Sequence, residues 1–104
     1  MKKSLWEILI PVRSNEGKPF SDKYYNNVFY ALLIDVAKGY TKLAPVDGAW
    51  ETDGQLYKEK MIPVRVLCTK KEIEGIAAFV VIHYNQLAVM YYKVSNECYI
   101  KEDK

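Results

Sequence analysis

The sequence predicts an α+β fold whose strands and helices follow one another in the order βαββαβ. Apolar residues alternate with a period of two in two separate stretches, near residues 4–12 and 61–68, as in half-buried strands. In two further stretches, apolar residues recur instead at helical spacing. The chain has 104 residues, so we expect all elements to form one domain, residues 1–104, with a modest core.

The first strand is expected over residues 4–12, where alternate positions are apolar: Trp6, Ile8, Ile10 and Val12. Gly17 and Pro19 indicate a turn over residues 14–19. Ser21 is then placed to be the N-cap of a helix, and Gly39 is placed to end it. The apolar residues at helical spacing between them are Val28, Phe29, Leu32, Leu33 and Val36.

Two more strands are expected in the middle of the chain. Residues 40–50 indicate a short strand, in which Pro45 marks an edge or a bulge. Residues 61–68 indicate a third strand, with alternation of Ile62, Val64, Val66 and Cys68.

Thr69 and Glu72 form the sequence pattern of a capping box, which predicts the start of a second helix. Its apolar face contains Ile73, Ile76, Ala77, Val80 and Tyr84. Residues 87–94 indicate a fourth strand, and because its beginning is apolar on both faces we expect it to be central. Residues 98–100 are a candidate for a short extra strand.

Two helices on one face of a four-stranded antiparallel sheet form the ferredoxin-like arrangement. The other sheet face is bare in a single chain, and depending on register it carries some of Trp6, Ile8, Arg65, Met90 and Tyr92. Large apolar patches are uncommon on soluble monomers, so we expect a homo-oligomer. A trimer with inward-facing sheets is the first expectation, and a dimer is the second.

Composition excludes several classes of function. A formal charge of +2, with acids and bases interspersed, does not indicate a nucleic-acid partner. Two cysteines indicate reduced thiols in the cytoplasm, and the sequence has no membrane-spanning apolar run. The single histidine, His83, is expected to cap a helix end, so neither a metal nor a cofactor is predicted. The glycines do not form a phosphate-binding loop.

Residues 48–59 contain Trp50, Tyr57 and Glu59 in a segment rich in glycine and charge, which we interpret as a loop over a small molecule or a subunit. Glu59 could hold the ammonium group of a ligand by a charge-assisted bond, or could be a solvated side chain between two lysines. Trp50 could stack on an adenine or on a cation, or could cover its own sheet.

The chain resembles two known groups of proteins. The first is a family of small bacterial ferredoxin-like domains with a G-x-W segment, a D-G pair, a glutamate and a glutamine before an apolar strand. The matching residues are Gly48, Trp50, Asp53, Gly54, Glu59 and Gln86.

The second group is the phage enzymes that degrade S-adenosylmethionine and have a trimeric fold similar to the nitrogen-regulatory PII proteins. The similarity lies in R-S-N at 13–15, G-x-W before Glu59, V-R-V-L-C at 64–68 and the spacing from Gln86 to Lys93. It spans roughly residues 5–95 in short motifs. Two departures stand out: Trp50 occupies the place of a functional tyrosine, and Glu59 lies slightly farther from the cysteine.

This resemblance implies a PII-like trimer with a ligand site at Arg13, Ser14, Trp50, Tyr57, Glu59 and Gln86, in which Glu59 is the catalytic residue. It implies a lyase that forms methylthioadenosine and homoserine lactone, acting against methylation-dependent restriction in a phage host's cytoplasm. The resemblance also implies that the role of the phage enzymes' functional tyrosine is taken by Tyr57 or is lost. Such a reaction needs a held conformation of the substrate rather than a general base. Two alternatives stay open: a non-catalytic PII-like module that binds a nucleotide-type molecule, and a purely structural oligomer.

Overall fold

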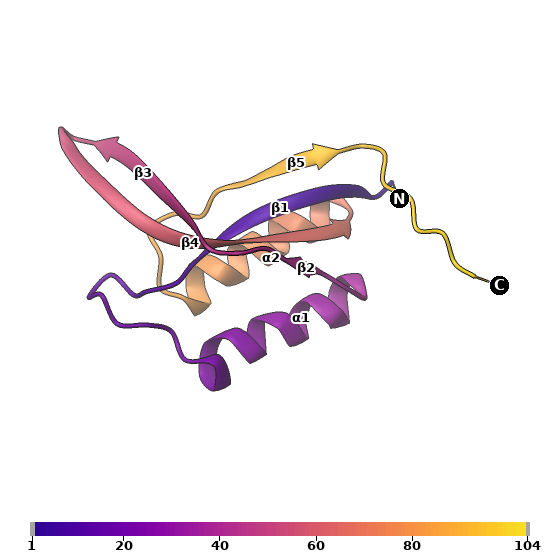
Figure 1. Cartoon of the computed structure of the whole chain (residues 1–104), viewed down its shortest axis with the longest axis horizontal. Helices are drawn as coiled ribbons and strands as arrows, with labels where there is room; N and C mark the ends of the chain where they lie inside the picture. Colours follow the sequence, from indigo (N-terminus) through magenta and orange to yellow (C-terminus); the bar gives the residue numbers. More distant parts are fainter. Residues whose placement is uncertain (1, 104) are drawn as a thin grey trace.

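The computed structural model describes residues 2–103. Both helices lie on the same side of a twisted antiparallel sheet, and a long hairpin projects beyond it (Figure 1). The elements in chain order are β1 (Ser4–Pro11), the π-helical turn η1 (Asp22–Asn26), α1 (Asn27–Ala37), β2 (Thr41–Lys42), β3 (Val46–Thr52), β4 (Gln55–Cys68), α2 (Lys70–His83) and β5 (Tyr91–Ser95).

The sheet confirms the ferredoxin-like prediction. Its strands lie in the order β2-β4-β1-β5, and β3 pairs with β4 as well. Thr41 of β2 pairs with Arg65, and Val46 of β3 pairs with Met61, so β2 and β3 follow one another along the same edge of β4. They are two pieces of one edge strand, interrupted around Pro45, which leaves four strand positions.

The predicted loop over residues 48–59 is wrong, because this segment is a hairpin of β3 and β4. Asp53 and Gly54 form its turn with φ values of 51° and 76°. Two consecutive positive φ values are typical of the type I′ turn, which matches the twist of a hairpin. Strand β4 therefore begins well before the expected 61–68 segment, at Gln55.

The expected central position of the fourth strand is also wrong. Strand β5 begins at Tyr91 and, among the strands within residues 2–103, pairs with β1 alone, while β1 and β4 hold the centre of the sheet. Leu87 and Met90, which suggested burial on both faces, are 90% and 64% exposed. Residues 98–100 form no strand, and Tyr99 is 84% exposed.

The core lies between the sheet and the helices. Trp6 and Ile8 face the helices, so they do not belong to the bare sheet face where they were candidates. The buried face of α2 is the predicted one, with Ile73, Ile76, Ala77, Val80 and Tyr84.

The helix ends follow local capping chemistry. In α2, Thr69 Oγ1 accepts from the Glu72 amide at 3.1 Å and the Glu72 carboxylate accepts from the Thr69 amide at 2.9 Å, which confirms the capping box. Ser21 accepts from the Tyr24 amide at 3.1 Å and caps η1. Helix α1 ends before the predicted Gly39, because Lys38 itself adopts the left-handed conformation with φ 66°. Neither α1 nor α2 is long and apolar enough to cross a membrane, nor is any other helix within residues 2–103.

Candidate functional site

The projecting hairpin brings three predicted site residues onto one face. Trp50 pairs with Tyr57, and Gly48 pairs with Glu59, so all four positions point to the same side of the two strands. The rings of Trp50 and Tyr57 are stacked, with centroids 4.8 Å apart and planes inclined by 21°. Both rings remain accessible, at 42% and 38% exposure. An aromatic pair and a carboxylate therefore share one exposed surface.

The Glu59 side chain is exposed and makes no hydrogen bond or ion pair with another residue in the described range 2–103. It borders a shallow hollow of about 500 Å³, which is lined by residues 47–49 and 58–60 of the two hairpin strands. Gly48 lies opposite Glu59 on the neighbouring strand, and a Cβ at this glycine would collide with the end of the Met61 side chain. Gly48 thus leaves the space that Met61 occupies, and the carboxylate of Glu59 stays open to a ligand or to a second chain.

Arg13 and Ser14 lie in a different place, where they hold the turn between β1 and η1. Arg13 Nη1 donates to the Gly17 carbonyl at 3.2 Å. The Ser14 amide donates to the Lys18 carbonyl at 2.7 Å, and Ser14 Oγ accepts from the Lys18 amide at 3.1 Å. Their polar groups therefore stabilise the local turn.

Gln86 lies just beyond α2 and bonds to the end of that helix. Its amide group donates to the Tyr84 carbonyl at 3.0 Å, and its backbone N–H donates to the Val81 carbonyl at 2.9 Å. Next to it, the Asn15 side chain donates to the Asn85 carbonyl at 3.3 Å and ties the β1–η1 turn to the end of α2.

Between that turn and the end of α2 lies a cleft of about 350 Å³ with an aromatic wall of Phe20, Tyr25 and Tyr84. Ser14 lines this cleft. The cleft shares no lining residue with the hollow beside Glu59. By strand register and hydrogen bonding, the six predicted residues form two groups within a single chain, one on the hairpin (Trp50, Tyr57, Glu59) and one at the β1–η1 turn and the end of α2 (Arg13, Ser14, Gln86).

His83 packs in an aromatic cluster away from the hairpin face. Its Nε2 donates to the Tyr25 carbonyl at 3.1 Å, and its ring stacks on Phe79 with centroids 4.8 Å apart. This imidazole links α2 to η1, rather than capping its own helix as predicted. Among residues 2–103 no three histidine, cysteine or acidic side chains converge as metal ligands would.

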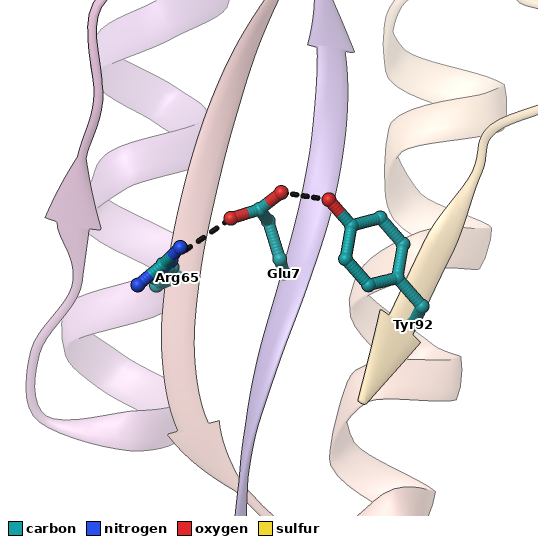
Figure 2. A network of polar contacts seen from close by, with 3 residues as sticks. All are labelled: Glu7, Arg65 and Tyr92. Carbon is teal, nitrogen blue, oxygen red and sulfur yellow. Dashed lines mark hydrogen bonds and ion pairs between the residues drawn. The ribbon is translucent and has the colours of Figure 1, made fainter. Parts of the chain in front are cut away.

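Sequence reasoning missed a polar network on the open face, by which we mean the sheet face away from the helices (Figure 2). Glu7 lies there between Arg65 and Tyr92, its register partners on the two neighbouring strands. Arg65 Nε donates to one carboxylate oxygen at 2.9 Å, and the Tyr92 hydroxyl donates to the other. The one signal in the sequence is a charged residue inside the apolar alternation of β1.

The network keeps Glu7 ionised although it is buried, with a relative exposure of 6%. Burial by itself would raise the pKa of this carboxyl, but the hydrogen bonds from Tyr92 and Arg65 and the charge of Arg65 more than offset it, so the pKa lies below its usual range. The hydrogen bond to Glu7 in turn raises the pKa of the Tyr92 hydroxyl.

No known protein family profile and no curated protein matches the sequence. Solved structures do resemble the fold. A phage SAM lyase in complex with S-methyl-5′-thioadenosine superposes with a TM-score of 0.67 at 9% identity, covering 91% of this chain and 82% of that chain. The divalent cation tolerance protein CutA1 from Thermus thermophilus gives a TM-score of 0.62 at 10% identity, covering 98% and 87% of the two chains. CutA from Synechococcus elongatus PCC7942 gives 0.52 at 10% identity, covering 91% and 78%.

These comparisons confirm that the chain has the PII-like, ferredoxin-like fold that the resemblance implied. At 9% and 10% identity they concern the fold alone.

Proposed function

We propose that the protein is an S-adenosylmethionine lyase that forms methylthioadenosine and homoserine lactone. One observation carries the proposal: the fold matches that of a phage SAM lyase over 91% of the chain. The exposed hairpin face that combines Trp50, Tyr57 and Glu59 supports it.

The reaction suits a chain that has a single histidine and no metal cluster among residues 2–103. An oxygen of the substrate carboxylate bonds to Cγ of the methionine chain. The Cγ–S bond breaks, and its electron pair stays on sulfur, which becomes the neutral thioether of methylthioadenosine. No proton is transferred, so the protein has only to hold the substrate in a curled, near-attack conformation.

The hairpin residues take distinct roles in this proposal. The Glu59 carboxylate binds the α-ammonium group and fixes the methionine end of the substrate. Trp50 and Tyr57 already stack on each other, so the adenine or the sulfonium packs on the outer face of the pair rather than between the rings. In this proposal further contacts to the substrate come from a different part of the chain, from Arg13, Ser14 and Gln86.

A site built from both groups of residues needs a second chain in this proposal, because Ser14 and Glu59 line separate hollows in one chain. We therefore place the site at a boundary between subunits of a homotrimer, and the partner subunit also covers the exposed Glu59. The biological setting that fits the lyase is the host cytoplasm during phage infection, where loss of S-adenosylmethionine weakens methylation-dependent restriction.

A second candidate is a module that binds a nucleotide-type molecule without converting it. The likeness to CutA1, which covers 98% of this chain, favours a PII-like binding protein as the alternative. The third candidate is a structural oligomer in which Trp50 and Glu59 make subunit contacts.

One experiment separates the three functions. The protein is incubated with S-adenosylmethionine, methylthioadenosine is measured by chromatography, and heat of binding is measured by calorimetry on the same preparation. Methylthioadenosine above the buffer control supports the lyase, and heat without product supports the binding module. If neither signal appears, the structural oligomer is the function that remains.

A further inference from the structure

The open face combines an apolar surface with one ionic group at its centre. The register places Leu5 opposite Leu67 and Leu9 opposite Pro63 on this face, and Glu7 with Arg65 and Tyr92 between them. Along β5 and the residue before it, the side chains that point the same way are exposed, with Met90 at 64%, Tyr92 at 41% and Val94 at 39%. A contiguous apolar face of this kind indicates a binding surface.

The hairpin extends the same face beyond the sheet. Along β4 the positions that alternate with Arg65 are Pro63, Met61, Glu59 and Tyr57. Trp50 and Val46 of β3 lie opposite Tyr57 and Met61, and are 42% exposed each. The open face and the proposed site are therefore one continuous surface.

The ionic group at the centre limits which partner can cover this surface. Glu7 and Arg65 neutralise each other on the sheet part of this surface, and Glu59 on the hairpin adds an acidic side chain that has no ion pair among residues 2–103. Arg65 uses Nε for Glu7, and within residues 2–103 its two terminal nitrogens contact no acceptor, with the side chain 41% exposed. A partner that covers the face must bring acceptors for these nitrogens, because N–H groups that are buried without an acceptor are costly.

A second copy of the chain meets this requirement. Its own open face carries the hydroxyl oxygen of Tyr92, and also Thr41, which pairs with Arg65 in the register and points the same way. Two copies can therefore satisfy the guanidinium groups only in relative positions that bring one of these hydroxyls, or the Glu59 carboxylate of the same surface, to Arg65. Apolar contacts alone would allow the two copies to pack in many relative positions.

We propose that the Glu7–Arg65–Tyr92 network selects the one arrangement in which copies of this chain pack through their open faces. The apolar residues supply the affinity, and the network disfavours alternative registers and stoichiometries because the terminal N–H groups of Arg65 would be buried in them without acceptors. This inference rests on the proposed assembly of the protein and adds a role that the reaction does not require.

The test replaces both ionic partners by apolar side chains, in the variant Glu7→Leu with Arg65→Met. Replacing the pair together avoids leaving one charge unpaired. Ser4→Ala is the matched control, because Ser4 Oγ donates to Asn96 Oδ1 at 3.3 Å and also links β1 to the chain just after β5. Native mass spectrometry and light scattering measure stoichiometry, and circular dichroism confirms folding.

We expect a single stoichiometry for the parent and for Ser4→Ala, and a mixture of stoichiometries for the double variant. A double variant with the parent's single stoichiometry overturns the inference, and so does a monomeric parent. If the double variant does not fold, Tyr92→Phe decides, because it removes one hydrogen bond and leaves the ion pair. We expect the Tyr92→Phe variant to show a second stoichiometry as well. If this variant has only the parent's stoichiometry, the inference is wrong. Methylthioadenosine formation by the parent is measured separately, so the lyase can fail while the packing role stands.

Discussion

Trp50 and Tyr57 stack on each other across the β3–β4 hairpin, with ring centroids 4.8 Å apart, on the same side as Glu59. This pair is the main side-chain contact that orders the projecting end of the hairpin, since residues 49–60 are all exposed. It is therefore both a stabilising contact and the surface that we propose for the ligand.

We predict that Trp50→Ala weakens ligand binding and lowers the free energy of unfolding slightly. Aromatic pairs contribute roughly 0.5–1.5 kcal/mol beyond their buried area. Trp50→Tyr keeps a ring opposite Tyr57 and should bind like the parent. Thermal unfolding and calorimetric titration of both variants with S-adenosylmethionine measure the two effects. Equal binding by Trp50→Ala and the parent would show that the pair serves structure alone.

Thr69→Ala should destabilise the fold without changing the site. The hydroxyl of Thr69 accepts from the Glu72 amide at the start of α2, and loss of such a cap costs about 1 kcal/mol. Urea unfolding should show a lower midpoint, while ligand affinity per folded molecule stays the same. A variant with parental stability and no binding would place Thr69 in the ligand site instead.

Acidification should remove stability that the ionised Glu7 contributes. The pKa of Glu7 is lower in the folded protein than in the unfolded chain, so the stabilisation is complete above the unfolded pKa and is lost as the pH falls through the folded pKa. The free energy of unfolding should therefore decrease as the pH falls below the ordinary pKa range of carboxyl groups. Glu7→Gln should be less stable at neutral pH and should depend less on pH in the acid range.

Glu72 has a lowered pKa as well, chiefly because its carboxylate accepts from the Thr69 backbone, and it contributes a pH dependence of the same sign. Glu72→Gln is therefore the control that separates the two carboxyls. If Glu7→Gln had the parent's full acid dependence, the network would not hold Glu7 ionised.

The parts of the fold that were predictable from the sequence are those where burial imposes a period. Strand β1, the second half of β4 and the buried face of α2 alternate or repeat because one side packs in the core. The hairpin was mistaken for a loop because both of its faces are exposed, which leaves its residues without an apolar period. The Asp53–Gly54 pair was the remaining signal, as a typical type I′ turn.

The candidate site was predictable only in part, for a related reason. Trp50, Tyr57 and Glu59 are close in sequence, and the hairpin register places them on one face. Arg13, Ser14 and Gln86 are far from them in sequence, and the single chain keeps them in a separate group. The Glu7 network depends on the register of three strands, which the sequence does not specify, because Glu7 and Tyr92 are 85 positions apart.

Glu59→Gln is the variant that bears most directly on the proposed reaction. It keeps the shape of the side chain and removes its charge, and because Glu59 is exposed and unpaired among residues 2–103, the fold and the oligomer should be unchanged. Loss of a charge-assisted hydrogen bond to the substrate ammonium should reduce affinity or turnover by about ten- to a hundred-fold. Glu51→Gln is the matched control, since Glu51 lies on the same hairpin but pairs with Leu56 on its other face. Methylthioadenosine formation should be lost in Glu59→Gln and kept in Glu51→Gln, with both variants folded by circular dichroism. Equal product from the two variants would mean that Glu59 does not bind the substrate.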